Sequence, residues 1–162
     1  LSNKIIDFYD GTPLNNLTIL IPHELSHQWF YSLVGNDQAL EPWLDEAIAT
    51  YSESLFYERY HPEYLQWWWD NRVYAHEHNG YVNNSIYEAG SYENYRASVY
   101  LNGAIFMQDL SKNLGKEAFL SALKHYVENN QYSIATRQEF FGALQQANPI
   151  DLNLLLLKYF RQ

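Results

Sequence analysis

Two histidines four residues apart, His23 and His27, stand near the start of the sequence, and Glu24 directly follows the first of them. On an α-helix, residues four apart share a face, so both imidazoles can reach one ion. The sequence has no cysteine, so a third strong ligand must be His, Asp or Glu. Glu46 follows His27 with eighteen residues between them, on the next expected helix. This pattern predicts a metal site formed by His23, His27 and Glu46.

Two imidazoles and one carboxylate leave a tetrahedral zinc ion with one open position, which is the arrangement of catalytic zinc sites. Zinc lowers the pKa of a bound water toward about 7 and polarises a carbonyl group. Glu24 can then take the proton from that water and pass it to the leaving amine. We therefore expect one zinc ion per chain and hydrolysis of peptide substrates.

Two further carboxylates lie near these residues in the sequence. Asp45 is next to Glu46, and Glu53 is seven residues beyond Glu46 on the same helix face. Both are candidates for groups that orient the metal ligands through hydrogen bonds. Either could equally be an ordinary surface carboxylate.

Three segments carry a resemblance to a known family: PHELSHQWF at 22–30, WLDEAIATY at 43–51 and YLNGA at 100–104. In their residues and spacing they resemble the aminopeptidase N-like family of zinc gluzincins. The family has a Tyr-x-Lys-Gly-Ala segment whose tyrosine stabilises the oxyanion of the reaction, and the resemblance implies this role for Tyr100. Asn102 stands where the family has lysine.

The resemblance also implies a fold: the helical portion of a thermolysin-like gluzincin catalytic domain, with little or no sheet. It is clear over about residues 20–114. We expect one domain over residues 1–162, with 1–17 as an entry segment. The chain begins at Leu1 and its only methionine is Met107, so we expect a piece of a longer or processed protein that contacts missing domains of its parent.

The resemblance leaves the type of peptidase open. Family members anchor a free amino terminus with a Gly-x-Met-Glu-Asn segment upstream of the zinc motif, and these 162 residues do not contain it. We expect the parent chain to supply this segment and to be an aminopeptidase, of which these residues alone would be an incomplete enzyme. If the parent lacks it, an endopeptidase or a non-peptidase role is expected.

The composition limits the classes of partner that this protein can bind. Nineteen acidic residues against ten basic ones give a net charge of −9, which repels phosphate backbones, so we expect no nucleic-acid partner. No apolar run is long enough to span a membrane. The compartment stays open, with the cytoplasm slightly favoured.

The positions of apolar residues predict a mainly helical domain. Thr136 and Glu139 fit a capping box before one helix, and Asp151 can cap the last one, whose leucine run at 154–157 we expect in the core. The expected helices cover about 17–34, 42–60, 62–78, 95–113 and 116–129, then a segment after Thr136 and a last one after Asp151.

Three consecutive tryptophans, Trp67, Trp68 and Trp69, cannot all face one way on a helix. We expect at least one exposed ring, favouring a contact with missing domains or a substrate groove over a carbohydrate platform. This suggests an alternative function, a zinc-retaining, non-catalytic module that binds a peptide or a partner. The presence of both Glu24 and Tyr100 favours the enzyme, because a binding module needs neither.

Overall fold

Helices account for nearly all the regular structure of residues 9–162, the part of the chain that this computed structural model describes. Within that part, strand pairing is limited to two isolated bridges, Phe30 with Val34 and Gly35 with Ile134. The prediction of a mainly helical fold with little or no sheet is therefore confirmed. Of the predicted entry segment, residues 1–8 lie outside the described residues, and residues 9–15 precede the first described helix.

Two of the long helical segments change their winding along the way. The segment from Pro62 to Tyr74 and the segment from Tyr92 to Leu114 both include wider, π-helical turns. The described elements are α2 (Asn16–Ser26), α3 (Trp43–Tyr60), η1 (Pro62–Tyr64), α4 (Leu65–Trp68), η2 (Trp69–Tyr74), α5 (Tyr92–Tyr95), η3 (Arg96–Asn102), α6 (Gly103–Leu114), α7 (Lys116–Asn130), α8 (Arg137–Ala147) and α9 (Asn153–Tyr159).

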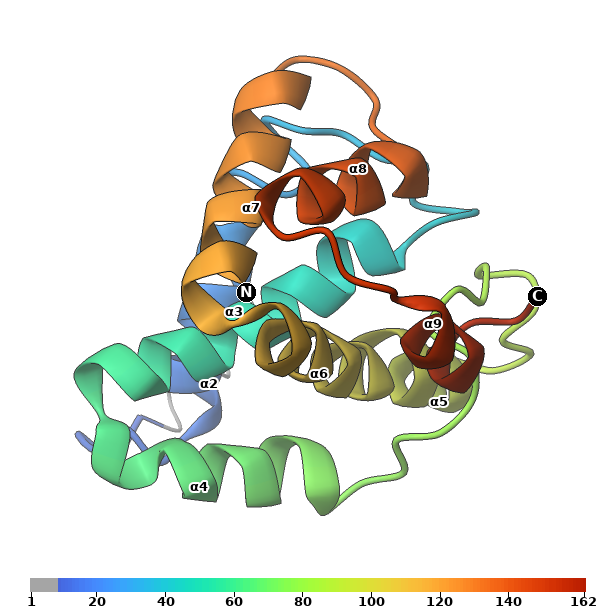
Figure 1. Cartoon of the computed structure of the whole chain (residues 1–162). Helices are drawn as coiled ribbons and strands as arrows, with labels where there is room; N and C mark the ends of the chain where they lie inside the picture. Colours follow the sequence, from blue (N-terminus) through green and yellow to red (C-terminus); the bar gives the residue numbers. More distant parts are fainter. Residues whose placement is uncertain (1–8) are drawn as a thin grey trace.

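Helix α3 runs through the middle of the molecule, in contact with α2, α4, η3 and α6 (Figure 1). Its first half is almost wholly buried, and its aromatic residue Trp43 packs against Phe106, Phe140 and Phe160 from three other helical regions. Figure 1 shows the segment of α4 and η2 below α6, and α7 and α8 above it. A central helix that is buried on most sides can hold polar residues in fixed positions between its neighbours.

Local signals in the sequence set several helix ends. The side chain of Asn15 caps α2 by accepting a hydrogen bond from the Thr18 backbone nitrogen at 3.0 Å. The predicted capping box is confirmed, because Thr136 and Glu139 exchange side-chain and backbone hydrogen bonds at the start of α8. Gly115 separates α6 from α7 with a φ of 87°, a left-handed conformation that favours glycine.

Three predictions about the helices are wrong. Helix α2 ends at Ser26 instead of continuing to residue 34, because the backbone nitrogens of Gln28 and Trp29 donate to carbonyls only three residues back, in tight turns. Further on, Tyr31 adopts a φ of 136°, which is incompatible with a helix. The third helical segment ends at Tyr74 rather than at residue 78. Leu154 and Leu157 of the leucine run are exposed, because a short helix at the edge of the molecule can bury only one of its faces.

The predicted exposed tryptophan is also absent from this fold. Trp68 is fully buried, Trp69 is nearly so, and Trp67 is half-buried against the core. The aromatic triplet is therefore part of the interior and offers no stacking platform.

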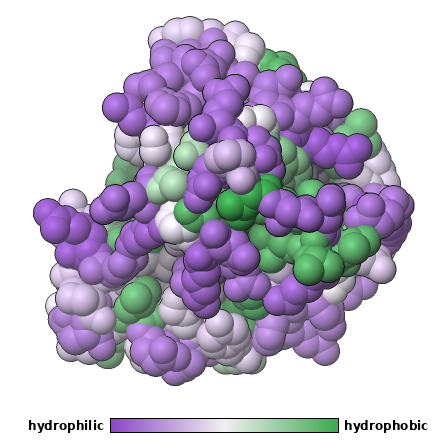
Figure 2. All heavy atoms as spheres, viewed as in Figure 1, coloured by the Kyte–Doolittle hydropathy of each residue, from purple (hydrophilic) through white to green (hydrophobic). Residues whose placement is uncertain are grey.

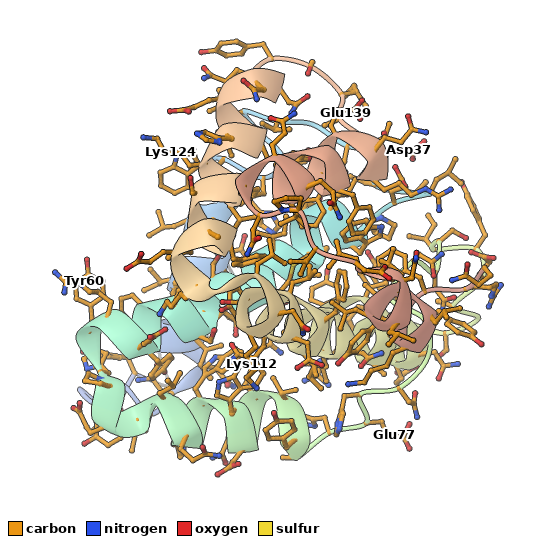
Figure 3. All side chains as sticks on the ribbon, in the orientation of Figure 1. Asp37, Tyr60, Glu77, Lys112, Lys124 and Glu139 are labelled. Carbon is orange, nitrogen blue, oxygen red and sulfur yellow. The ribbon has the colours of Figure 1, made fainter. Side chains whose placement is uncertain are left out.

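The charged side chains labelled in Figure 3, among them Asp37, Glu77, Lys124 and Glu139, point away from the body of the protein. Figure 2 shows hydrophilic side chains over most of the same face, with hydrophobic ones gathered toward its middle and lower right. Among the described residues, none of the helices has the length and apolar character needed to cross a membrane.

One close helix contact yields a test of this packing. A Cβ atom at Gly103 would lie 2.6 Å from the Ala47 Cβ, so α6 approaches α3 as closely as it does only because residue 103 is glycine. We expect Gly103→Ala to lower the free energy of unfolding by about 1–3 kcal/mol, measured by urea denaturation. Gly142→Ala in α8 is the matched control, because its Cβ meets nothing within 4 Å, and it should be neutral or stabilising. Equal effects of the two substitutions would contradict the close contact.

Candidate metal centre

Helices α2 and α3 bring three potential metal ligands to one point. Oε2 of Glu46 lies 3.3 Å from Nε2 of His23 and 3.6 Å from Nε2 of His27. The two imidazole rings meet edge to face, with their centroids 4.9 Å apart. One ligand atom from each residue falls within 4.8 Å of the others, and no other group of this kind occurs in residues 9–162. The structure therefore brings together the trio that the sequence predicts.

The contacts of Glu46 fit a metal site better than a hydrogen-bonded cluster. Its buried Oε2 has no hydrogen-bond partner among the described residues, although two imidazole nitrogens lie close by. Ligand atoms about 2.0–2.1 Å from a tetrahedral zinc ion are roughly 3.3–3.4 Å apart, which is close to the 3.3 and 3.6 Å between Oε2 and the two imidazole nitrogens. A buried carboxylate oxygen is costly without a partner, and a metal ion would supply one. The donor set therefore suits zinc.

Both imidazoles are oriented with Nε2 toward this point. Nδ1 of His27 lies 3.2 Å from the carbonyl oxygen of Phe30, which can only accept, so Nδ1 carries the proton. Nδ1 of His23 lies 2.9 Å from Oε1 of Glu53 and donates to that carboxylate in the same way. Each hydrogen bond keeps Nδ1 protonated and directs Nε2 to this point, so Nε2 can bind a metal once it has lost its own proton. The early end of α2 matters here, because the turn after Ser26 places the Phe30 carbonyl beside His27.

The same contacts shift the pKa values of the metal-free site. Burial alone would raise the pKa of Glu46, but the neighbouring His23, His27 and Tyr100 lower it to about 2. Burial alone would lower the pKa of His23, but Glu46 and Glu53 raise it to about 9. The Glu46 carboxylate is therefore ionised at neutral pH, as a metal ligand must be.

Tyr100 lies against the predicted ligands. Its ring stacks on His23 with centroids 6.0 Å apart and planes 6° from parallel, and Tyr95 packs edge-on against it. Burial and the charge of nearby Glu46 raise the pKa of the Tyr100 hydroxyl, which therefore stays protonated and can donate a hydrogen bond. Tyr100 sits in the π-helical turns of η3, and such turns often occur at functional sites.

The other three predicted carboxylates lie in different surroundings. Glu24 is exposed on α2, next in the chain to His23. Glu53 is fully buried and contacts His23. Asp45 is buried too, but it accepts hydrogen bonds from the Gln38 side chain and from the Glu46 backbone nitrogen, so it acts on the first turn of α3. Burial raises the pKa of Asp45 to about 6.

Two residues near this site were not predicted. Trp68 and Arg72 both donate hydrogen bonds to Glu53, the carboxylate that contacts His23. Their spacing of four residues on one helical segment was the available signal, since it places an indole and a guanidinium on one face. The sequence gives no indication of which carboxylate they would meet, because Glu53 lies on a different helix.

The comparison with protein families matches residues 9–159 to the Peptidase family M1 domain. Aminopeptidase M1 of Arabidopsis thaliana is 28% identical over 151 residues, which cover 88% of this chain and 17% of that protein. Aminopeptidase M1-A of Oryza sativa subsp. japonica is 26% identical over 159 residues, which cover 90% of this chain and 18% of that protein. The chain thus spans less than a fifth of the length of these curated relatives.

Solved structures with the same fold also match. An M1 zinc metallopeptidase from Deinococcus radiodurans aligns with a TM-score of 0.70 and 23% identity, covering 91% of this chain and 34% of that one. A mutant of that enzyme bound to a Tyr-Ser-Ala substrate aligns with the same TM-score and 22% identity. These likenesses show that the helices of this chain have the arrangement found in those structures.

The raised pKa of His23 predicts how the stability of the metal-free chain depends on pH. Folded His23 holds its proton more tightly than the unfolded chain, where the pKa is about 6.5. The resulting stabilisation is fully present below pH ~6.5 and is lost as the pH rises through about 9. We expect the free energy of unfolding, measured by urea denaturation with a chelator, to fall over this range, with His23 contributing at most about 1.4 kcal/mol per pH unit.

Two histidine variants provide the controls for this measurement. His23→Gln should reduce the decline between pH 6.5 and 9, whereas His125→Gln, at an exposed position on α7, should keep it in full. A decline of the same size in all three proteins would show that His23 is not its source.

Proposed function

The chain belongs to peptidase family M1, and we propose that it forms the zinc-binding part of an aminopeptidase that hydrolyses peptide bonds. The observation that carries this proposal is the convergence of His23, His27 and Glu46 around a buried carboxylate oxygen that has no hydrogen-bond partner in residues 9–162. We propose that these three residues hold one zinc ion per chain. When bound, zinc would acidify a water molecule and polarise the substrate carbonyl.

The remaining roles belong to side chains of this chain. Glu24, adjacent to His23, accepts the proton of the attacking water and delivers it to the leaving amine. Tyr100, a protonated hydroxyl beside Glu46, donates a hydrogen bond to the carbonyl oxygen as negative charge develops there. Asp45 holds the backbone nitrogen of Glu46 and so fixes the start of α3, from which Glu46 projects.

The names of the relatives support an aminopeptidase over an endopeptidase, since the curated proteins described above are called aminopeptidases. The alternative of a non-catalytic binding module is not favoured. Such a module would have no use for a protonated tyrosine hydroxyl beside the ligands.

We propose that the rest of the parent protein covers one exposed apolar face of the described chain. Ile21, Leu25 and Trp29 are 42%, 55% and 52% exposed on α2 and in the turn that follows it. Apolar side chains grouped in this way are typical of a contact surface. The Glu24 side chain lies on the exposed side of the same helix, where a substrate and a neighbouring domain could meet.

The metal site is tested by elemental analysis of the purified chain after chelation, zinc re-addition and removal of free metal. We expect about one zinc per chain, because three side chains bind it and the helix that carries Glu46, α3, is well packed. Glu46→Ala should lose it, since two histidines alone bind zinc far more weakly. Glu58→Ala, on the same helix but paired with Lys116 away from the site, is the matched control and should keep the metal. Equal zinc content in Glu46→Ala would contradict the ligand set.

The reaction is tested on the zinc-loaded parent protein with an aminoacyl fluorogenic amide and with the same compound acetylated at its amino group. An aminopeptidase cleaves the first and spares the second. We expect Glu24→Gln to lower kcat/KM by roughly 10²–10⁴-fold and Tyr100→Phe by roughly 10²–10³-fold, both with zinc retained. Zinc-bound wild-type protein that cleaves neither compound would favour the binding module, and cleavage of internal bonds in blocked peptides would favour an endopeptidase.

A further inference from the structure

Glu53 carries a fully buried charge whose hydrogen-bonding capacity is entirely used. Its Oε1 accepts from Nδ1 of His23 at 2.9 Å and from Nη2 of Arg72 at 3.0 Å. Its Oε2 accepts from Nε1 of Trp68 at 3.0 Å and from Nε of Arg72 at 2.8 Å. An ionised carboxylate has about four lone-pair positions, so four donors leave it no freedom to rotate.

Three of these four hydrogen bonds come from one helical segment. Trp68 is the last residue of α4, and Arg72 lies in the π-helical turns of η2. Arg72 reaches both oxygens of Glu53 in the bidentate geometry that a guanidinium allows, and its side chain is largely buried with the carboxylate. The fourth acceptor position of Glu53 is the one that His23 occupies.

We propose that Trp68 and Arg72 are positioning residues for the metal centre, because they fix Glu53 so that it orients the His23 ring with Nε2 toward the metal. This inference rests on the proposed zinc site. It assigns a role to Trp68, one of the three consecutive tryptophans of which the sequence predicts at least one exposed ring. It also explains why a charged pair is kept in the core between α3 and the α4–η2 segment, where apolar side chains would pack as well.

A purely structural ion pair would produce different effects. If Arg72 and Trp68 only joined α3 to the neighbouring segment, their loss would change the free energy of unfolding and leave the properties of a bound metal unaltered. If they position His23, their loss changes metal affinity and geometry even in molecules that are fully folded. Groups that orient a metal-bound histidine typically contribute 10–100-fold to metal affinity.

The test measures zinc dissociation constants by competition with a chromophoric chelator, and the visible absorption of the Co²⁺-substituted chain. We expect Arg72→Met to bind zinc about 10–100-fold more weakly than the unsubstituted chain, and Trp68→Phe at least about threefold more weakly. Arg72→Lys keeps the positive charge but loses the paired N–H groups that reach both oxygens of Glu53. It should therefore weaken zinc binding as much as Arg72→Met does. The Co²⁺ bands should shift in all three variants, because they report ligand geometry.

Trp69→Phe is the matched control. It makes the same chemical change in the adjacent residue, and the Trp69 indole packs against Trp68 and Tyr74 without taking part in the Glu53 cluster. It should bind zinc within about twofold of the unsubstituted chain, with unchanged Co²⁺ bands. Circular dichroism and urea unfolding of each metal-free variant give its folded fraction, and affinities are compared for folded protein only.

The outcomes separate the two proposals. If the unsubstituted chain binds no zinc, the proposed metal site is wrong and this inference is wrong with it. If it binds zinc and Trp68→Phe and Arg72→Met bind equally tightly with unchanged Co²⁺ bands, the metal site holds and only the positioning role is overturned. A loss in Trp69→Phe as large as that in Trp68→Phe also overturns the positioning role, since it would reflect general packing.

Discussion

A carboxylate without access to water must be surrounded by donors, and in this protein that requirement ties the proposed metal site to the core. Glu53 has no exposed surface, and the donors that satisfy it come from α2, α4 and η2. Leaving a buried charge unpaired costs several kcal/mol, so these elements cannot separate without a large penalty. The position of His23 is thereby coupled to the packing of α3 against two neighbours.

The departures from regular helix geometry lie next to the proposed metal site. Helix α2 stops at Ser26, which lets the Phe30 carbonyl turn back and accept a hydrogen bond from His27. The wider turns of η2 and η3 carry Arg72 and Tyr100, which approach the site from two further directions. Widened turns and abrupt helix ends lack some of the hydrogen bonds between residues four apart that stabilise an α-helix. They are therefore stable only where other contacts compensate for this loss. Here those contacts are made by the predicted ligands and their neighbours.

The apolar core provides the rigid frame for these polar groups. Trp43 begins α3 amid a cluster of aromatic rings, and Gly103 lets α6 approach the same helix closely three residues after Tyr100. Close-packed interiors transmit small displacements, so a shift of α6 would move Tyr100 relative to Glu46. In the Tyr-x-x-Gly-Ala pattern, Tyr100 therefore lies beside the site and Gly103 makes the packing contact that holds Tyr100 in place.

The sequence by itself determined the residues able to bind a metal and most of the helices. His23 and His27 could be identified from their helical spacing alone, and the capping box of α8 from hydrogen bonds between residues three apart. The sequence could not show that α2 ends at Ser26, that Trp68 lies in the core, that Leu154 and Leu157 are exposed, or that Arg72 reaches Glu53. Spacing and capping act over a few residues, whereas burial and ion pairing depend on which helices meet, and only the tertiary structure decides that.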